Sequence, residues 1–188
     1  MSPNLQRMIE ESGSVIGGLR RQEKTIQRIG QTMVRCLEHD GKILTCGNGG
    51  SAADALHMAE ELVGRYDRER RSLPPIALTA DSTLLTCIPN DYGFEHVFTR
   101  QIEGLGRKGD VLIGFSTSGN SQNIIRAIET AKKRELITVA LLGKDGGPTK
   151  GLADHEIIVG SQRTARVQEA HTLILHLLLE IVDARFVK

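Results

Sequence analysis

Three short apolar segments, each followed at once by a loop rich in glycine or serine, constrain the fold more than any other feature of the chain. They read KILTCG (42–47), DVLIGFS (110–116) and TVALLG (138–143), and the loops after them are GNGGS, STSGNS and GKDGG. Residues 74–80 and 155–159 are two further apolar segments. Because helical patterns separate these segments, we expect a parallel sheet that is covered by helices on both faces.

The remaining elements follow from hydrophobic spacing and from glycine and proline. Residues 3–39 are expected to be helical, with interruptions at Gly13 and at Gly17–Gly18. The sequence predicts a loop at IPNDY (88–92), a solvated basic loop at 65–71, and helices over 52–66, 82–87, 94–105, from Asn120 or Ser121 to 133, and 164–185. No linker or low-complexity stretch divides the chain, so we predict one domain, 1–188, whose residues 1–40 form N-terminal helices.

Composition argues against several classes of protein. The 24 basic and 23 acidic residues give a net charge of +1, and only 3% of residues are aromatic, so neither charge nor base stacking favours nucleic acid. The three cysteines form no C-x-x-C pair, which indicates reduced thiols in a cytosol. The N-terminus has no signal-peptide pattern, and the apolar run 174–182 is too short to span a bilayer. We therefore expect a cytoplasmic protein with no membrane partner.

The STSGNS loop is the clearest predicted ligand site. Ligands of parallel sheets bind beyond the carboxyl ends of the strands, where this loop lies. The helix after it offers free N–H groups and the positive end of its dipole to an anion. Simple capping needs fewer than the four hydroxyls present here, on Ser116, Thr117, Ser118 and Ser121, so the loop favours a phosphate group. It lacks the lysine of a P-loop, so a nucleoside triphosphate is not indicated.

The GNGGSA turn (47–52) has a weak similarity to a dinucleotide-binding turn. That motif needs an acidic residue about 20 positions later, and Asp81, which follows the next predicted strand, is too distant. A turn that lets the backbone approach a small ligand is the better interpretation.

Several polar side chains fall at helical spacing on two predicted helices. His57 and Glu61 are four residues apart, as are His176 and Glu180, and Gln168 lies eight residues before His176. Spacing leaves two interpretations open: histidines satisfied within the core, or three protein ligands of a catalytic zinc with one open position. Glu60 is expected to be solvated.

Five stretches together resemble the sugar isomerase (SIS) family. They are GNGGSAADALHMAEELVGRY, ERRSLPPIALTADSTLLTCIPNDYGFEHVFTRQI, GDVLIGFSTSGNSQN, LLGKDGG and RVQEAHTLILHLL, and they cover nearly all of the chain beyond residue 40. The resemblance implies a three-layer αβα sandwich with a five-stranded parallel sheet. It also implies a cytoplasmic homotetramer with active sites at subunit contacts, and we expect residues 1–40 to take part in those contacts. The implied activity converts sedoheptulose 7-phosphate to glycero-manno-heptose 7-phosphate, the first step towards the heptose of lipopolysaccharide core.

The resemblance also implies roles for individual residues. The residues that match those contacting the phosphosugar are Asn48, Gly49, Gly50, Glu61, Asn90, Asp91, Ser116, Thr117, Ser118, Ser121 and Gln168. One zinc ion per subunit is implied, with His57, Glu61, Gln168 and His176 as ligands. Glu61 and His176 also match the acid–base pair, which moves a proton between C1 and C2 through an enediol. The two roles compete, because a zinc-bound carboxylate or imidazole is a poorer proton carrier.

Two alternatives remain from other functional classes. One is a non-catalytic relative that keeps the sheet, the tetramer and the serine loop but binds the bacterial replication initiator. Such a relative lacks the acid and base at the positions of Glu61 and His176, and this chain has both. The other is a module that senses a sugar phosphate without turnover.

Overall fold

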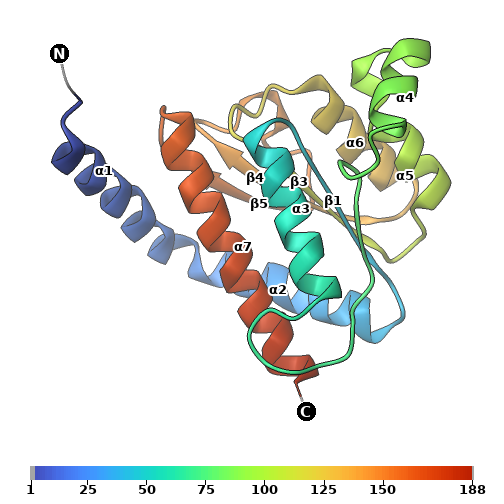
Figure 1. The fold of residues 1–188 in the computed structure, drawn as a ribbon, viewed down its shortest axis with the longest axis horizontal. Coiled ribbons are helices and arrows are strands. Elements are labelled where there is room, and N and C mark those ends of the chain that lie inside the picture. The colour runs from blue at the N-terminus through green and yellow to red at the C-terminus, as the bar shows by residue number, and fades with distance from the viewer. Residues whose placement is uncertain (1–2, 188) are drawn as a thin grey trace.

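A single five-stranded sheet forms the centre of the molecule in the computed structural model, which describes residues 3–187 (Figure 1). All neighbouring strands are parallel, in the order β2-β1-β3-β4-β5. The strands are β1 (Ile43–Gly47), β2 (Pro75–Ala77), β3 (Val111–Ser116), β4 (Ile137–Gly143) and β5 (His155–Val159). The predicted parallel, five-stranded sheet is confirmed.

Helices cover both faces of the sheet, which confirms the three-layer sandwich. The side chains of a strand alternate between its two faces. Ile113 and Phe115 therefore pack against α2 (Glu23–Glu38), α3 (Gly50–Val63) and α7 (Thr164–Phe186). Leu112 and Leu142 face the other way, against α5 (Thr99–Leu105) and α6 (Gln122–Lys133).

The strand order reverses between β1 and β3, and this reversal positions the two ligand loops. The chain leaves β1 through α3 on one face of the sheet and leaves β3 through α6 on the other. A crevice forms at such a switch point, beyond the carboxyl ends of the two strands. GNGGS follows β1 and STSGNS follows β3, so both loops border this crevice.

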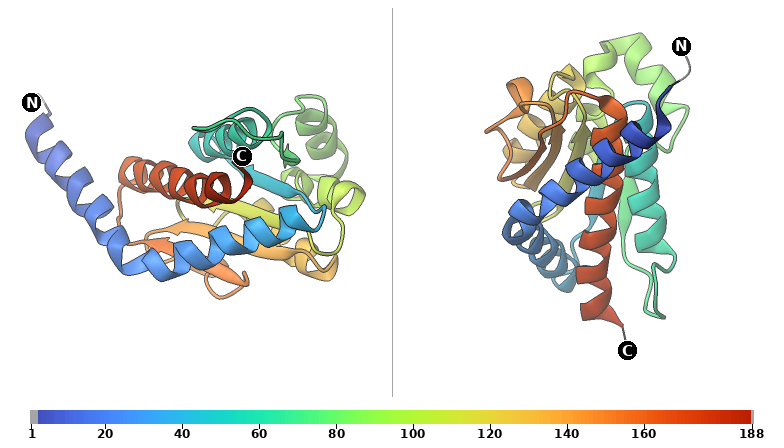
Figure 2. Two further views of the ribbon diagram at one scale, coloured as in Figure 1. Left: turned by 90° about the horizontal axis from the view of Figure 1, so that it is seen from below. Right: turned by 90° about the vertical axis from the view of Figure 1, so that its left-hand side faces the viewer.

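The N-terminal helices differ in one respect from the expectation. Gly13 does not interrupt α1 (Leu5–Gly18), whereas Gly17–Gly18 ends it, followed by the 3₁₀ turn η1 (Leu19–Gln22) and then α2. Gly13 is exposed, and glycine within an exposed helix costs only about 1 kcal/mol relative to alanine, too little to break it. Figure 2 shows α1 extending away from the body of the molecule beyond the start of α7.

The predicted loop at IPNDY is wrong, because residues 88–92 belong to α4 (Leu84–Tyr92) with Pro89 inside the helix. The Asp81 carboxylate accepts hydrogen bonds from the N–H groups of Thr83 and Leu84 and so starts this helix. Proline removes only one backbone bond here, and the helix continues until Gly93, whose φ is 91°.

Several predicted boundaries also shift. The helix predicted over 94–105 is divided into the 3₁₀ turn η2 (Phe94–His96) and α5, and β2 is shorter than 74–80. α3 starts earlier than predicted, because Ala52 N already donates to Gly49 O. It ends at Val63 rather than at Tyr66, and Gly64 is its C-cap. The remaining 3₁₀ turn, η3 (Gly147–Thr149), follows the loop after β4.

The sequence predicts that the whole basic segment 65–71 is solvated, and this prediction is wrong at Arg70. Arg70 is buried, and its Nε donates to Asp183 Oδ1 at 2.7 Å. An arginine in a charged run gives no local signal of burial, since its partner lies far along the chain in α7. No helix within 3–187 has the length and apolarity needed to cross a membrane.

Candidate functional site

The glycine turn after β1 brings the backbone against α7. Gly49 has φ 56°, a conformation that favours glycine, and α3 begins at Gly50. A Cβ atom on residue 50 would lie 2.2 Å from Gln168 Nε2, closer than any side chain allows. The turn therefore favours glycine at residue 49 for its conformation, and a larger residue at position 50 would displace the Gln168 amide from its present place.

Helices α3 and α7 lie side by side, which brings together residues that are distant in the sequence (Figure 1). Thr172 Oγ1 donates to Asp54 Oδ1 at 3.0 Å between the two helices. One turn further on, the rings of His57 and His176 have their centroids 5.1 Å apart at an interplanar angle of 81°. Spacing in the sequence does not reveal that these two helices meet, and the structure places their polar residues side by side.

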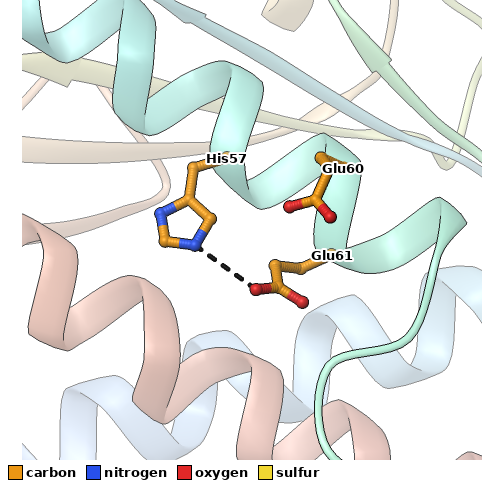
Figure 3. Close-up of side chains that lie close together, drawn as sticks. All are labelled: His57, Glu60 and Glu61. Carbon is orange, nitrogen blue, oxygen red and sulfur yellow. Dashed lines mark ion pairs between the residues drawn. The ribbon is translucent and has the colours of Figure 1, made fainter.

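His57 and Glu61 form a pair on the side of α3 that faces α7, as Figure 3 shows. His57 Nε2 lies 3.4 Å from Glu61 Oε1, and the two side chains are 35% and 19% exposed. Potential ligand atoms of His57, Glu60 and Glu61 lie within 4.8 Å of one another. Glu60 is exposed, as predicted, but its carboxylate lies near enough to be a further ligand candidate.

The donor set at this point suits a transition metal. His57 and His176 supply two imidazoles, and Glu61 supplies a carboxylate from the same helical face as His57. Nitrogen and oxygen donors of this kind bind catalytic zinc. Gln168 lies two turns before His176, against the glycine turn. The four predicted ligands thus line one seam between α3 and α7, with the imidazoles and Glu61 at one end and Gln168 at the other.

Two residues at this seam have no role in the sequence-based prediction. Tyr66 packs on His176 with ring centroids 5.8 Å apart, and its hydroxyl donates to Glu180 Oε1 at 3.4 Å. Burial and the nearby Glu180 carboxylate raise the pKa of the Tyr66 phenol. Asp54 is buried beside Thr172, and burial raises the pKa of its carboxyl. The sequence alone does not identify Tyr66 as a site residue, because its contact with His176 is known only once α7 is placed beside it.

The serine loop is held in shape by its own hydroxyls. Ser116 Oγ accepts from Gly119 N at 3.1 Å, and Ser118 Oγ accepts from Asn120 N at 3.2 Å. Ser121 occupies the N-cap position of α6 without a capping side-chain hydrogen bond. The Ser121 hydroxyl and the N-terminal end of α6 are therefore available to an anion.

An asparagine pair joins the two ligand loops across the switch point. Asn48 Nδ2 donates to Asn123 Oδ1 at 2.9 Å, and Asn123 Nδ2 donates to Asn48 Oδ1 at 2.8 Å. The pair holds the glycine turn and the start of α6 at a fixed separation. Asn123 is buried and absent from the predicted site, because a single asparagine early in a helix does not reveal a partner 75 positions away.

Asn90 and Asp91 lie apart from this seam. Both are exposed in the last turn of α4, where Asn90 Nδ2 donates to Asp91 Oδ1 at 2.8 Å. Across residues 3–187, no hydrogen bond links either of them to His57, Glu61 or His176. The fold of one chain therefore assembles the other predicted site residues around α3, α7 and α6 but leaves this pair separate.

Comparison with known proteins gives consistent results. The SIS domain family model matches residues 9–143. A protein of Nitratiruptor sp. named phosphoheptose isomerase is 59% identical over 153 residues, 81% of this chain and 82% of its own. The phosphoheptose isomerase of Neisseria meningitidis serogroup A is 48% identical over 181 residues, 95% of this chain and 89% of its own.

Solved structures agree over a similar length. The phosphoheptose isomerase structure from Neisseria gonorrhoeae has a TM-score of 0.88 at 43% identity and covers 96% of this chain and 100% of its own. The phosphoheptose isomerase structure from Francisella tularensis has a TM-score of 0.89 at 36% identity and covers 98% of this chain and 100% of its own.

Proposed function

Since the chain belongs to the SIS domain family, and its similarity to phosphoheptose isomerases extends over most of its length, we propose that it is an aldose–ketose isomerase. The proposed reaction converts D-sedoheptulose 7-phosphate to D-glycero-D-manno-heptose 7-phosphate. The observation that carries this proposal is the convergence of Glu61, His57 and His176 at the seam between α3 and α7. In the cell, the reaction is the first step of ADP-heptose synthesis for lipopolysaccharide core.

The phosphate is proposed to bind at the serine loop. Ser116, Thr117, Ser118 and Ser121 surround the N-terminal end of α6, where backbone N–H groups and the helix dipole favour an anion. Asn48, Gly49 and Gly50 approach the sugar from the neighbouring strand, and the Asn48–Asn123 pair fixes their distance from the phosphate. Gln168, against Gly50, contacts a sugar hydroxyl.

Proton transfer is proposed for Glu61 and His176. Isomerisation removes a proton from the carbon next to the carbonyl and returns one to the other carbon, through an enediol. Glu61 acts as the base and His176 as the acid that protonates the developing oxyanion, since the two side chains lie on facing helices with His57 between them. The phosphate loop keeps C1 and C2 of the sugar at this seam throughout.

One zinc ion per subunit is proposed at the same seam, held by His57, Glu61, Gln168 and His176. The Gln168 side chain lies against Gly50 at the other end of the seam, so it would have to turn towards His176 to reach the same ion. A metal ion there would supply Lewis-acid stabilisation of negative charge on a substrate oxygen. Glu60 is a competing ligand, since its carboxylate lies within the same group of donors as His57 and Glu61. A Glu61 or a His176 that binds metal is less free to move a proton, so His57 is the ligand that the acid–base mechanism tolerates best.

A cytoplasmic homotetramer is part of the proposal, with 1–188 as one SIS unit and the first 40 residues in subunit contacts. An apolar hollow of about 480 Å³ lies where α1, η1 and α2 meet α7, lined among others by Ile16, Leu19, Leu173 and Leu177. On α1 itself, Ile9 is 72% exposed. Association with further copies would cover this surface.

The runner-up function is a non-catalytic tetramer that binds the bacterial replication initiator. The presence of Glu61 and His176 on facing helices favours the isomerase. Incubation of the protein with sedoheptulose 7-phosphate, with and without chelator, followed by NMR of the product, tests the proposal. Formation of the aldose phosphate supports it. An inert protein that binds the replication initiator would establish the runner-up, and one that binds the phosphosugar without turnover would be a sensor.

A further inference from the structure

Arg70 carries a buried charge close to the proposed catalytic residues. Its side chain has 0% exposed area, and the side chain of its partner Asp183 has 2%. A buried guanidinium is costly unless it is paired and fully hydrogen-bonded. Asp183 provides the paired charge, since its Oδ1 accepts from Arg70 Nε at 2.7 Å. The other oxygen of Asp183, Oδ2, accepts from Asp67 N at 3.2 Å.

The remaining donors of Arg70 close the C-terminal end of α3. Arg70 Nη2 donates to the carbonyl of Glu61 at 2.6 Å, and Nη1 donates to the carbonyl of Leu62 at 3.0 Å. The last carbonyls of a helix have no partner within the helix, and a cation there also complements the helix dipole. Arg70 thus binds directly to the backbone of the residue proposed as the catalytic base.

Asp183 connects this cap to α7. It lies seven residues after His176, two turns along the helix and therefore on nearly the same face. We infer that the Arg70–Asp183 pair positions the acid and the base, because it joins the backbone of Glu61 on α3 to the helix that carries His176. Arg70 and Asp183 are positioning residues in this inference, which rests on the proposed function, and neither touches the substrate.

The same pair also fixes the segment that carries Tyr66. The segment leaves α3 at Gly64, and its far end is held by Arg70, by Asp67 N on Asp183, and by a bridge between Arg70 and Val187. Tyr66, between these anchors, packs on His176. Loss of the pair would therefore loosen one wall of the His176 ring as well as the end of α3.

The test separates positioning from simple stabilisation. In the double variant Arg70→Met with Asp183→Leu, both charges are removed together, so neither remains buried alone, and such exchanges are often neutral for stability. We expect its melting temperature to fall modestly, because the carbonyls of Glu61 and Leu62 lose their donor, while kcat of the folded protein for sedoheptulose 7-phosphate falls about tenfold to a hundredfold. KM should change by less than about threefold, since the phosphate loop lies on β3 and α6.

Two further variants keep the test decisive if the double variant does not fold. Arg70→Lys retains the charge but loses the planar fork that reaches the carbonyls of Glu61, Leu62 and Arg71 and the Asp183 carboxylate, so it should fold with a reduced kcat. Asp183→Asn keeps the shape of the side chain but leaves the Arg70 charge buried without a counter-charge, so it should lower the melting temperature as well as kcat.

A matched control is Asp110→Asn, which weakens the buried pair with Lys42 at the opposite, N-terminal end of the strands. It should lower the melting temperature and leave kcat unchanged. Folded Arg70 and Asp183 variants with wild-type kcat would overturn the inference, provided that the wild-type enzyme turns over the phosphosugar. An inert wild-type protein would instead overturn the proposed function.

Discussion

The imidazole rings of His57 and His176 meet nearly at right angles with their centroids 5.1 Å apart, although their helices, α3 and α7, are far apart in the sequence. Two imidazoles at this separation can direct nitrogens towards one shared cation or one substrate oxygen. The Glu61 carboxylate, 3.4 Å from His57, adds an oxygen donor and a base at the same point. The proposed metal binding and the proposed proton transfer therefore concern the same three side chains and need separate measurements.

The first prediction concerns which residue completes the metal site. Protein purified without chelator should contain up to one zinc per chain, as the single proposed site would hold. His176→Asn should lose most of this zinc, whereas Glu60→Gln, which changes the exposed carboxylate beside Glu61, should keep it. Elemental analysis measures the zinc content of each variant, and the shift in melting temperature on zinc addition shows whether the variant still binds the ion. Zinc loss confined to Glu60→Gln would move the site to His57, Glu60 and Glu61.

The second prediction concerns the acid and the base. General acid–base residues contribute ~10²–10⁴-fold in rate, so Glu61→Gln and His176→Asn should each lower kcat by about that factor. The variants should remain folded, because both side chains are partly exposed at the seam. They should also lose incorporation of solvent deuterium at C1 or C2, which reports the enediol directly by NMR. Turnover at the wild-type rate in folded Glu61→Gln would exclude this mechanism.

Sequence alone predicts the sheet and most of its loops, because strand, loop and helix signals are local. β5 is predicted at its observed bounds, 155–159, and β1 differs by one residue at its start. IPNDY fails because proline suggests a loop, whereas the Asp81 cap and the packing of Ile88 maintain a helix. Proline and glycine are thus reliable guides only where no capping or packing opposes them.

Part of the site is also predictable, because some of its signals are local in the sequence. The serine loop and the His57–Glu61 spacing are local patterns, and the structure contains both. Spacing says nothing about which helices meet, so the facing of His57 and His176 enters only through the resemblance. Asn123, Tyr66 and Arg70 are missed entirely, since each is defined by a partner on another element.

The third prediction separates binding from loop structure among the serines. Ser116 Oγ already accepts a hydrogen bond from Gly119 N, whereas Ser121 makes no capping bond to α6. Ser121→Ala should therefore raise KM for the phosphosugar with little change in melting temperature. Ser116→Ala should raise KM and also lower the melting temperature, since a buried hydrogen bond contributes about 1 kcal/mol. Calorimetry with the phosphosugar checks the binding, and unchanged affinity in both variants would remove the phosphate from this loop.

The fourth prediction concerns the stability of the fold in acid, through His171. This residue is fully buried under β3 and β4, with Nε2 3.2 Å from the carbonyl oxygen of Leu142 and the ring against Phe115. Burial lowers the pKa of His171 to about 4, although the hydrogen bond to Leu142 opposes the shift. In the native state the His171 ring therefore stays neutral over a pH range in which the same ring of the unfolded chain, with a pKa of about 6.5, is protonated.

The sign of the effect follows from that difference. Where the unfolded state binds more protons than the native state, stability falls as the pH falls. Between about pH 6.5 and pH 4 the His171 contribution should reduce the free energy of unfolding by roughly 3 kcal/mol, since one pKa unit corresponds to about 1.4 kcal/mol.

His171→Gln keeps a donor for Leu142 and does not titrate, so its urea-unfolding free energy should decline less steeply over this range than that of wild type. His39→Gln, which alters an exposed histidine, is the matched control and should follow wild type. Equal slopes for wild type and His171→Gln would show that His171 does not carry the acid sensitivity of this core.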